Sequence, residues 1–439
     1  RRGGRRRRVT MCIKTLDNIC PLCDAIDQLA EHSIGEQRRQ ACERQHHIGW
    51  PSRTSEAFRY CNLKPVAETA WHPAPHAKAD PAALEALAIE GTGARLVFVN
   101  GRFDAEASSD IPEYVQLLGP ILGETEIDRV AAFHDDPFAQ MSTALVEDGV
   151  LIEIPDGKTM EAPLHILHHH SGQDEPIAST LRTIIRLGRD ARACVLETWS
   201  GDGLAMVTPM TEVELSQGAH CDHARLVEHG DDVWHMGAIA SKQDANSTFE
   251  SVVLTVGGQT IRTLAHASLN GEGAHAALRG FGIGDDRRHI DSRLHVAHMA
   301  PNCTSREIFK HLLPDRSTAA FTARIYVNEG AHGTDAVQTS RNLLLSDTAK
   351  AWSRPELEIY ADDVKCTHGA TTGEIDPGGL FYLRARGVPE ATARALLAWA
   401  FAAEVINEVP VESLRTHLAS RILAQLPGAE TLDEGVVSL

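Results

Sequence analysis

The sequence predicts a mainly β protein with helical regions at both ends, and three observations support this fold class. From about residue 94 the 439-residue chain consists of short apolar runs, rich in β-branched side chains and bounded by Gly, Asp, Asn or Pro. Between about residues 180 and 340 no long amphipathic helix separates these runs, which argues against strand–helix–strand units. Gly-Ala-His recurs at 218–220, 273–275 and 330–332, at intervals of 55 and 57 residues that two or three turns of a β-solenoid would fill.

The N-terminal part of the chain has a helical pattern. Residues 11–90 space charged side chains among Leu, Ile and Ala. Arg1 to Thr10 precede the first methionine, Met11. We expect this Arg-rich opening to be an artefact of cloning or start-site assignment rather than a transit peptide or a nucleic-acid-binding arm. Four prolines then predict a broken connection near the end of the helical region, at Pro65, Pro73, Pro75 and Pro81.

Cys20 and Cys23 form a C-x-x-C pair, which can be redox active or can supply half of a zinc site. The sequence contains no second such pair and no thioredoxin-like βαβ pattern around this one. We therefore interpret the pair as structural.

Six segments are the clearest strand predictions. Each is a short β-branched run that ends at turn residues. The segments are 95–99, 150–154, 183–187, 194–197, 252–256 and 323–327.

The C-terminal part returns to helical periodicity. Gly387-Val-Pro389 is expected to end a preceding strand and start a helix, because Pro is tolerated in the first helical turn. A second, shorter helix is expected after Pro410. These helices can pack on their own domain, dock a partner, or do both. Their apolar residues at helical spacing are Leu396, Leu397, Ala400, Phe401, Val405 and Ile406 in the first helix, and Leu414, Leu418 and Ile422 in the second.

Composition excludes several classes of protein. The net charge is -18, although six of the first eight residues are Arg, so the rest of the chain is strongly acidic. Such a surface repels phosphate backbones and anionic lipid, which argues against nucleic-acid or membrane binding. No apolar run is long enough to span a bilayer. The nine cysteines are odd in number and irregularly spaced, which favours a reducing cytoplasm over a secreted disulfide framework.

The segment 361–373 carries the clearest candidate site. Its Cys366 and His368 are two residues apart, at the end of a strand-like run and just before a glycine turn. If the strand continues this far, the two side chains point to the same face. A thiolate and an imidazole aimed at one point can hold iron, zinc or copper, but one pair does not complete a site. The alternative is a half-buried Cys and a hydrogen-bonded His that end a sheet.

The surrounding residues resemble the SufB/SufD family, whose members are scaffolds for iron–sulfur cluster assembly. The likeness covers roughly residues 36–425, and the motif at 361–373 is highly specific. Thr-His-Gly-Ala at 367–370 fits the SufD branch better than the His-Glu-Ala form of SufB, although Ser is commoner than Thr at position 367. The other segments that carry the likeness are 49–63, 327–332, 341–360, 380–387 and 400–404.

The resemblance implies a right-handed parallel β-helix core with helical N-terminal and C-terminal regions. It implies a non-catalytic subunit that pairs with SufB and docks SufC, an ABC-type ATPase, on its C-terminal helices. It places His368, with Cys366 beside it, at the SufB interface, where a transient Fe–S cluster takes its missing ligands from the partner. No permanently bound cofactor is implied. The expected regions are an extension at 1–35, a helical region and linker at 36–93, the β-helix core at 94–380 and the SufC-docking region at 381–439.

Other sequence features are weaker candidates. Adjacent side chains of His168-His169-His170 would alternate between the faces of a strand, which makes a poor ligand set. His220, Cys221 and His223 are interpreted as a core or turn feature, and the loop 280–284 has no strand–helix context for nucleotide binding. The sequence has no G-x-x-x-x-G-K-[ST] loop, so ATP hydrolysis is expected in the partner.

Two alternatives stay open at this point. One is a SufB-like or homodimeric scaffold that holds the cluster by itself. The other is a β-helix carbohydrate-active enzyme, which needs paired carboxylates in a groove. Asp362-Asp363 is the only acidic pair in the motif, and its two side chains would face opposite ways, which disfavours the enzyme.

Overall fold

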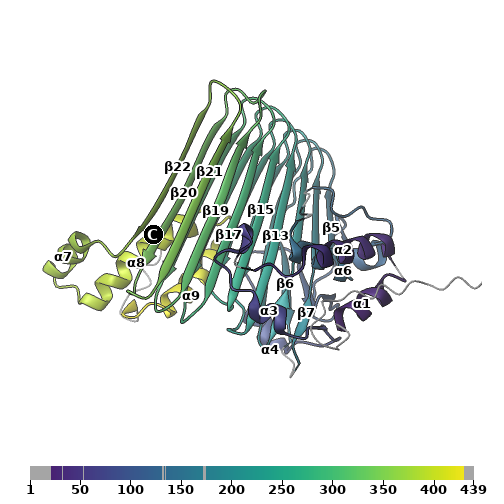
Figure 1. Ribbon diagram of the computed structural model, residues 1–439, viewed down its shortest axis with the longest axis horizontal. Helices are drawn as coiled ribbons and strands as arrows, with labels where there is room; N and C mark the ends of the chain where they lie inside the picture. The colour runs from purple at the N-terminus through teal and green to yellow at the C-terminus, as the bar shows by residue number, and fades with distance from the viewer. Residues whose placement is uncertain are drawn as a thin grey trace, which may run out of the picture.

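The core of the protein is a parallel β-helix, as Figure 1 shows. The computed structural model describes residues 21–31, 33–52, 54–130, 133, 135–171 and 175–429. Within these residues, eight successive turns each contribute one strand to sheet A and one to sheet B, and the strands of neighbouring turns pair in parallel. The predictions of a mainly β fold and a β-helix core are therefore confirmed.

The long strands alternate between the two sheets along the chain. In sheet A they are β5 (Gly149–Ile154), β8 (Arg182–Leu187), β11 (Met210–Leu215), β13 (Val233–Gln243), β15 (Thr260–Leu269), β17 (His289–His298), β19 (Thr318–Val327) and β21 (Lys350–Ile359). In sheet B they are β6 (Leu164–His170), β9 (Arg192–Gly201), β12 (His220–Val227), β14 (Thr248–Thr255), β16 (His275–Ile283), β18 (Thr304–Leu313), β20 (Asp335–Leu344) and β22 (Lys365–Gly373).

Short strands extend the first turns of the β-helix. In sheet A, β4 (Val115–Leu117) pairs antiparallel with β5, and in sheet B β2 (Arg95–Val99) joins β6 and the antiparallel β3 (Arg102–Phe103). A side branch on β13 consists of β10 (Ala205–Val207), β7 (Ile177–Ser179) and β1 (His72–Pro73). All six predicted strand segments overlap strands of the structure.

Alternate residues of every turn fill the interior. Their burial drives the fold, because fully burying a Leu or Phe side chain contributes ~1.5–3 kcal/mol. Phe309 and Phe321 pack with ring centroids 5.5 Å apart. Gly280 lies beneath Phe309, where an added Cβ would come within 2.3 Å of the ring. The interior is therefore packed tightly enough to require a glycine at that position.

The Gly-Ala-His repeat marks one corner of the β-helix at every second turn. Gly218 and Gly273 have left-handed φ angles of 72° and 71°, and Asn246, on the intervening turn, has a φ of 54°. Asn and Gly tolerate this conformation better than other residues, so they alternate at the corner. In the third copy the left-handed glycine is Gly333, three residues beyond Gly330.

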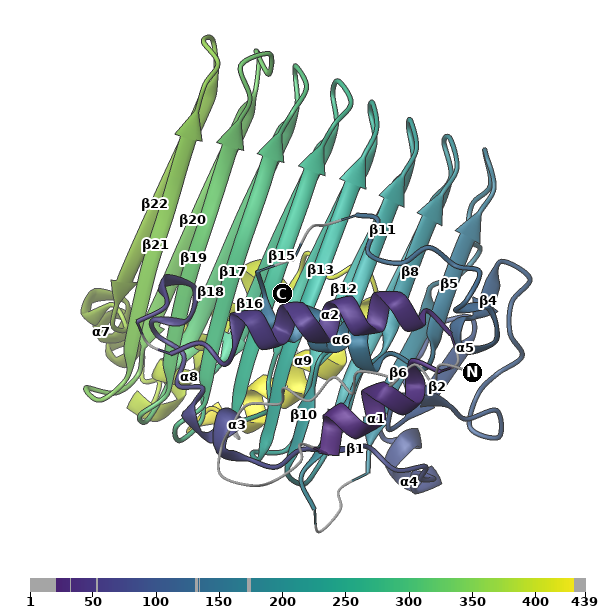
Figure 2. The same ribbon diagram turned by 45° about the vertical axis from the view of Figure 1, so that its right-hand side comes forward.

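The N-terminal helical region covers the outer face of sheet A, as Figure 2 shows for α2 and α6. An apolar cluster that includes Phe58, Trp71 and Phe138 packs there on Met206 and Met236 of the sheet. The helix α6 lies beyond the predicted helical range of 11–90. The elements are α1 (Pro21–Leu29), α2 (Gly35–Ile48), η1 (Glu56–Phe58), α3 (Lys64–Glu68), α4 (Pro81–Glu85), α5 (Leu118–Ile121) and α6 (Pro137–Leu145).

In the part of the chain that the structure describes, three helices follow the last strand: α7 (Pro377–Ala385), α8 (Glu390–Ile406) and α9 (Glu412–Ala424). Helices α8 and α9 cover the outer face of sheet B through a cluster that includes Trp399 and Leu418. The expectation that Gly387–Pro389 ends a strand was wrong, because the preceding element is α7. Asp376 caps this helix by accepting hydrogen bonds from the backbone N–H of Gly378 and Gly379, at 3.2 and 2.7 Å.

Candidate functional site

The β-helix ends in two strands whose outer edges have no strand partner among the described residues. These terminal strands are β21 in sheet A and β22 in sheet B. An open edge exposes backbone N–H and C=O groups that can pair with another chain.

Strand β22 positions both residues of the sequence motif. Cys366 stands opposite Ala336 and His368 stands opposite Gln338 in the register with β20. Ala336 and Gln338 are buried residues of the inward face, so Cys366 and His368 share the inward direction of the last strand. The motif was expected at the end of a strand, before a glycine turn; instead β22 begins at Lys365 and Gly369 lies within it.

The two side chains differ in their surroundings. Cys366 is half-buried and packs against an apolar cluster that includes Ile325, Val327 and Ala336. Burial raises the pKa of the Cys366 thiol, which disfavours the thiolate that binds metals. His368 is exposed. Of the two residues, His368 is therefore the one already accessible to an incoming metal.

A column of polar side chains lies behind His368, one residue from each turn. Gln338 on β20 precedes it, and Glu307 on β18 precedes Gln338 in the same register. The Gln338 side-chain amide donates a 2.8 Å hydrogen bond to the Glu307 carboxyl group. Burial raises the pKa of Glu307 to about 8, so this carboxyl group stays protonated at neutral pH. Sequence reasoning missed Glu307 and Gln338. The signal that could have found them is their position, because Glu307, Gln338 and His368 follow one another at intervals of one turn.

The two terminal edges differ in composition. Sheet edges are usually protected by charged residues, Pro or bulges. The edge strand β21 carries Pro355 and the charged residues Lys350, Arg354, Glu356 and Glu358. By contrast, β22 has no Pro and no charged residue after Lys365, and its segment 369–373 contains only Gly, Ala and Thr. The β22 edge thus lacks the usual protection against pairing.

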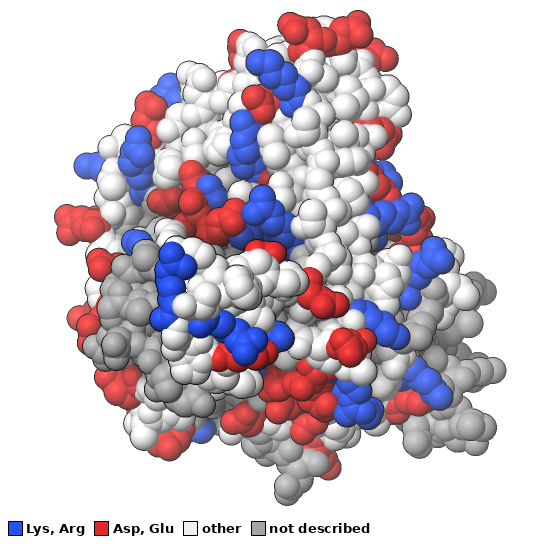
Figure 3. Space-filling model, turned by 90° about the vertical axis from the view of Figure 1, so that its left-hand side faces the viewer, with Lys and Arg blue, Asp and Glu red and all other residues white. Residues whose placement is uncertain are grey.

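Exposed aromatic side chains lie close to this end in the chain. Phe381 and Tyr382 of α7 are 75% and 54% exposed, and Tyr360 after β21 is 55% exposed. Helix α7 has no buried residue among those described. Figure 3 shows the face at the left of Figure 1, where broad uncharged areas separate clusters of both charge signs. Such a mixed surface suits a protein partner better than a phosphate backbone.

The other sequence candidates fall elsewhere. On β6, His168 and His170 are buried while His169 is half-buried, so the three side chains do alternate. On β12, His223 is buried and Nδ1 lies 2.9 Å from the Ser251 hydroxyl, a core role. Cys20 lies outside the described residues, as does the side chain of Cys23. Asp363 takes a left-handed φ of 54° in the turn before β22, which gives the acidic pair a role in the turn.

Comparisons with known proteins match almost the whole described chain. Residues 169–401 match the model of the SUF system FeS cluster assembly, SufBD core domain, and residues 22–166 match that of the SufBD protein N-terminal region. The iron-sulfur cluster assembly protein SufD of Escherichia coli is 29% identical over 89% of this chain and 93% of its own length. An iron-sulfur cluster assembly SufBD family protein of Mycobacterium bovis is 30% identical over 73% of this chain and 80% of its own length. Within the described residues, no helix has the length and apolar character that crossing a bilayer requires.

Proposed function

Because the chain belongs to the SufBD family of SUF-system iron–sulfur cluster assembly proteins, we propose that it is a SufD-like scaffold subunit. In this proposal it pairs with a SufB-like subunit through β22, and a nascent Fe–S cluster forms at their junction. The unprotected β22 edge, with Cys366 and His368 on its inward face, is the observation that carries the proposal.

The site calls for ligands supplied by a partner. His368 offers one imidazole nitrogen, and Cys366 offers a thiol whose ionisation burial disfavours. A cluster needs more ligands than these, and mixed Cys and His ligation of Fe–S clusters is chemically sound. A strand added to the β22 edge would bring the missing ligands alongside His368. The cluster is cargo here, assembled and passed on, and no permanently bound cofactor is proposed.

The C-terminal region at 381–439 is proposed to dock a SufC-type ATPase, which would supply the ATP hydrolysis. Helices α8 and α9 already bury their apolar residues against sheet B, whereas Phe381 and Tyr382 of α7 stay exposed. We therefore assign the docking contact chiefly to α7. The extension at 1–35 and the region at 36–93 are assigned no partner. The complex is proposed to work in the cytoplasm, without nucleic acid or membrane.

The test is co-expression of a tagged chain with SufB and SufC from one host, followed by purification of the complex. Wild-type protein should bring down both partners and carry an Fe–S cluster, measured by absorbance and iron content. Recovery of this chain as a homodimer that reconstitutes a full cluster alone would favour the homodimeric scaffold and contradict the proposal.

His368→Ala is expected to leave the complex and its melting temperature unchanged but to lower cluster content strongly, because it removes the accessible ligand. Cys366→Ala should have a smaller effect, since its thiol is half-buried and un-ionised. Thr367→Ala is the matched control, because its side chain points to the opposite face of the same strand. Wild-type cluster content in a well-folded His368→Ala complex would show that this histidine is structural.

A further inference from the structure

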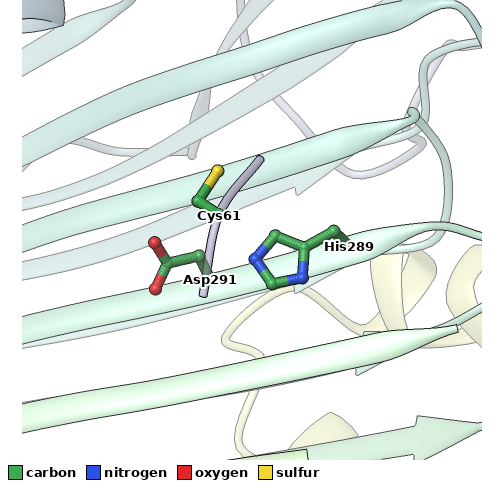
Figure 4. Close-up of side chains that lie close together, drawn as sticks. All are labelled: Cys61, His289 and Asp291. Carbon is green, nitrogen blue, oxygen red and sulfur yellow. The ribbon is translucent and has the colours of Figure 1, made fainter. Parts of the chain in front are cut away.

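Three side chains with metal-binding atoms converge where the N-terminal region covers sheet A (Figure 4). Cys61 comes from the segment between η1 and α3, and His289 and Asp291 come from β17. Their thiol, imidazole and carboxylate atoms all lie within 4.8 Å of one another. The three residues are only 1%, 8% and 6% exposed. This cluster is separate from the terminal strand, so the inference does not depend on the proposed function.

The fold holds both sides of the cluster in place. His289 and Asp291 are two residues apart on one strand and therefore point to the same, outward face of sheet A. The segment that carries Cys61 is anchored by two residues that precede the cysteine. Tyr60 stacks on Trp352 at 5.0 Å, and the Arg262 guanidinium lies 4.3 Å from the centre of the Phe58 ring. The stacking of Tyr60 on Trp352 thus brings the thiol to the sheet through a contact that does not involve the cluster itself.

Hydrogen bonds and charges around the cluster are compatible with a bound cation. The Nδ1 atom of His289 lies 2.8 Å from the Thr318 hydroxyl, an outer partner that orients the ring and leaves Nε2 as the ligand atom. Asp291 pairs with Arg262 through Oδ2 at 3.4 Å. Arg262 is also held by Asp136 at 2.6 Å, so the guanidinium keeps a carboxylate partner when Asp291 turns toward a metal.

The ligand set selects the class of metal. One thiolate, one imidazole and one carboxylate suit Zn²⁺ or Fe²⁺ rather than Mg²⁺ or Ca²⁺. At zinc-like bond lengths of about 2.0–2.3 Å, tetrahedral ligand atoms are roughly 3.3–3.8 Å apart, so the site needs only a small contraction. We propose that Cys61, His289 and Asp291 bind one divalent transition-metal ion of this class, which fastens the N-terminal segment to the β-helix.

Cobalt titration of the full chain tests this site, because a Co²⁺–thiolate bond gives a distinct charge-transfer band. The background variant carries Cys20→Ser, Cys23→Ser, Cys366→Ser and His368→Ala. These substitutions prevent the other candidate ligands from binding Co²⁺. We expect one equivalent of Co²⁺ to give the band in this background and Cys61→Ser to abolish it. His289→Gln should weaken binding at least about 10-fold, the lower end of what losing even an outer-shell partner costs. Cys303→Ser, which removes a buried thiol elsewhere, should match the background.

A second readout covers variants that fold poorly. Zn²⁺ should protect the peptide bond after Arg59 from trypsin in the background variant, but not when His289→Gln or Asp291→Asn is added. Near-ultraviolet circular dichroism of each protein without metal shows whether it is folded. A thiolate band that persists in Cys61→Ser would overturn the proposal. A folded background that binds no Co²⁺ and gains no protection from Zn²⁺ would overturn it as well.

Discussion

At the scale of single residues, the interior of the β-helix is unusual in holding titratable groups behind the candidate site. Glu307 is fully enclosed two turns before the end of sheet B, and it accepts a hydrogen bond from the neutral amide of Gln338. A carboxylate without a cation is costly in such a place, so burial keeps the proton on Glu307. The residue is therefore expected to influence stability through pH rather than through an ion pair.

Glu307→Gln is predicted to remove a pH-dependent loss of stability. The folded pKa of about 8 lies above the ordinary value of 4.5, so only the unfolded chain releases this proton between those values. The contribution of Glu307 to the free energy of unfolding is therefore most favourable below about pH 4.5. It falls by on the order of 3–5 kcal/mol as the pH rises toward 8. Urea unfolding at pH 5 and pH 8.5 should show that the free energy of unfolding of the variant, relative to that of the wild type, is higher at pH 8.5 than at pH 5. Identical pH dependence of the two proteins would refute this assignment.

At the scale of elements, the terminal strand β22 has a defined set of outward backbone groups. The Lys365 N–H donates to the Thr334 carbonyl of the preceding turn at 2.8 Å. Because successive residues of a parallel strand alternate their N–H direction, the N–H groups of Cys366, His368 and Ala370 face the open edge. A partner strand would use these groups, and they can be removed without touching the bonds to β20.

Ala370→Pro is predicted to abolish pairing with a SufB-like partner while leaving the isolated chain folded. Proline removes an outward N–H and places its ring at the edge, where Pro is tolerated within a single chain. Ala370→Ser keeps the N–H and serves as the control, which should pair normally. Size-exclusion chromatography of the mixed subunits measures pairing, and thermal melting measures folding. Full pairing by a folded Ala370→Pro protein would place the interface elsewhere.

Helix α7 offers a cleaner test of ATPase docking than removal of the C-terminal region. Deleting 389–439 would expose the apolar outer face of sheet B, because α8 and α9 cover it. The double variant Phe381→Ala and Tyr382→Ala removes exposed rings instead, and it should leave the melting temperature almost unchanged. We expect it to weaken SufC capture at least about 10-fold, as aromatic anchors often contribute 2 kcal/mol or more to an interface. The control is Met299→Ala, which removes an exposed apolar side chain elsewhere. Undiminished SufC capture by the double variant would exclude α7 as the docking site.

At the scale of the whole molecule, buried neutral histidines set the acid limit of stability. Burial lowers the pKa of His165 and His170 to about 3 and that of His266, His298 and His311 to about 4. Burial also depresses the pKa of His168, His229 and His235 well below the ordinary value. In the unfolded chain these groups take up protons below about pH 6.5, which the folded protein cannot do.

Stability is therefore predicted to fall as the pH drops from 7 to 5. Each of these histidines contributes up to about 1.4 kcal/mol per pH unit once the pH is below its unfolded value, so the combined slope should be steep. Carboxylates with lowered pKa, such as Asp128, act only below about pH 4 and do not share this window. Unfolding free energies measured at pH 7, 6 and 5, in the Glu307→Gln variant to remove one strongly opposing group, provide the check. A flat profile would mean that the histidines titrate in the folded state.

The sequence by itself determined the features that depend on neighbouring residues. Two-residue alternation indicated the strands and the shared face of Cys366 and His368, and helical spacing indicated α8 and α9. The Gly-Ala-His interval indicated the solenoid, because each copy marks the same corner two turns apart. The specific motif at 361–373 indicated the family.

Only the tertiary structure decided what depends on register between turns. It placed Glu307 and Gln338 in one column with His368, since residues about one turn apart become neighbours only when the strands pair. It brought Cys61 beside His289, although the two are 228 positions apart in the chain. Helix α7 (Pro377–Ala385) is a different case, because its Asp376 cap is a local bond that the sequence contains but hydrophobic periodicity does not reveal. Local patterns fix which way a side chain points, whereas long-range pairing fixes what it meets.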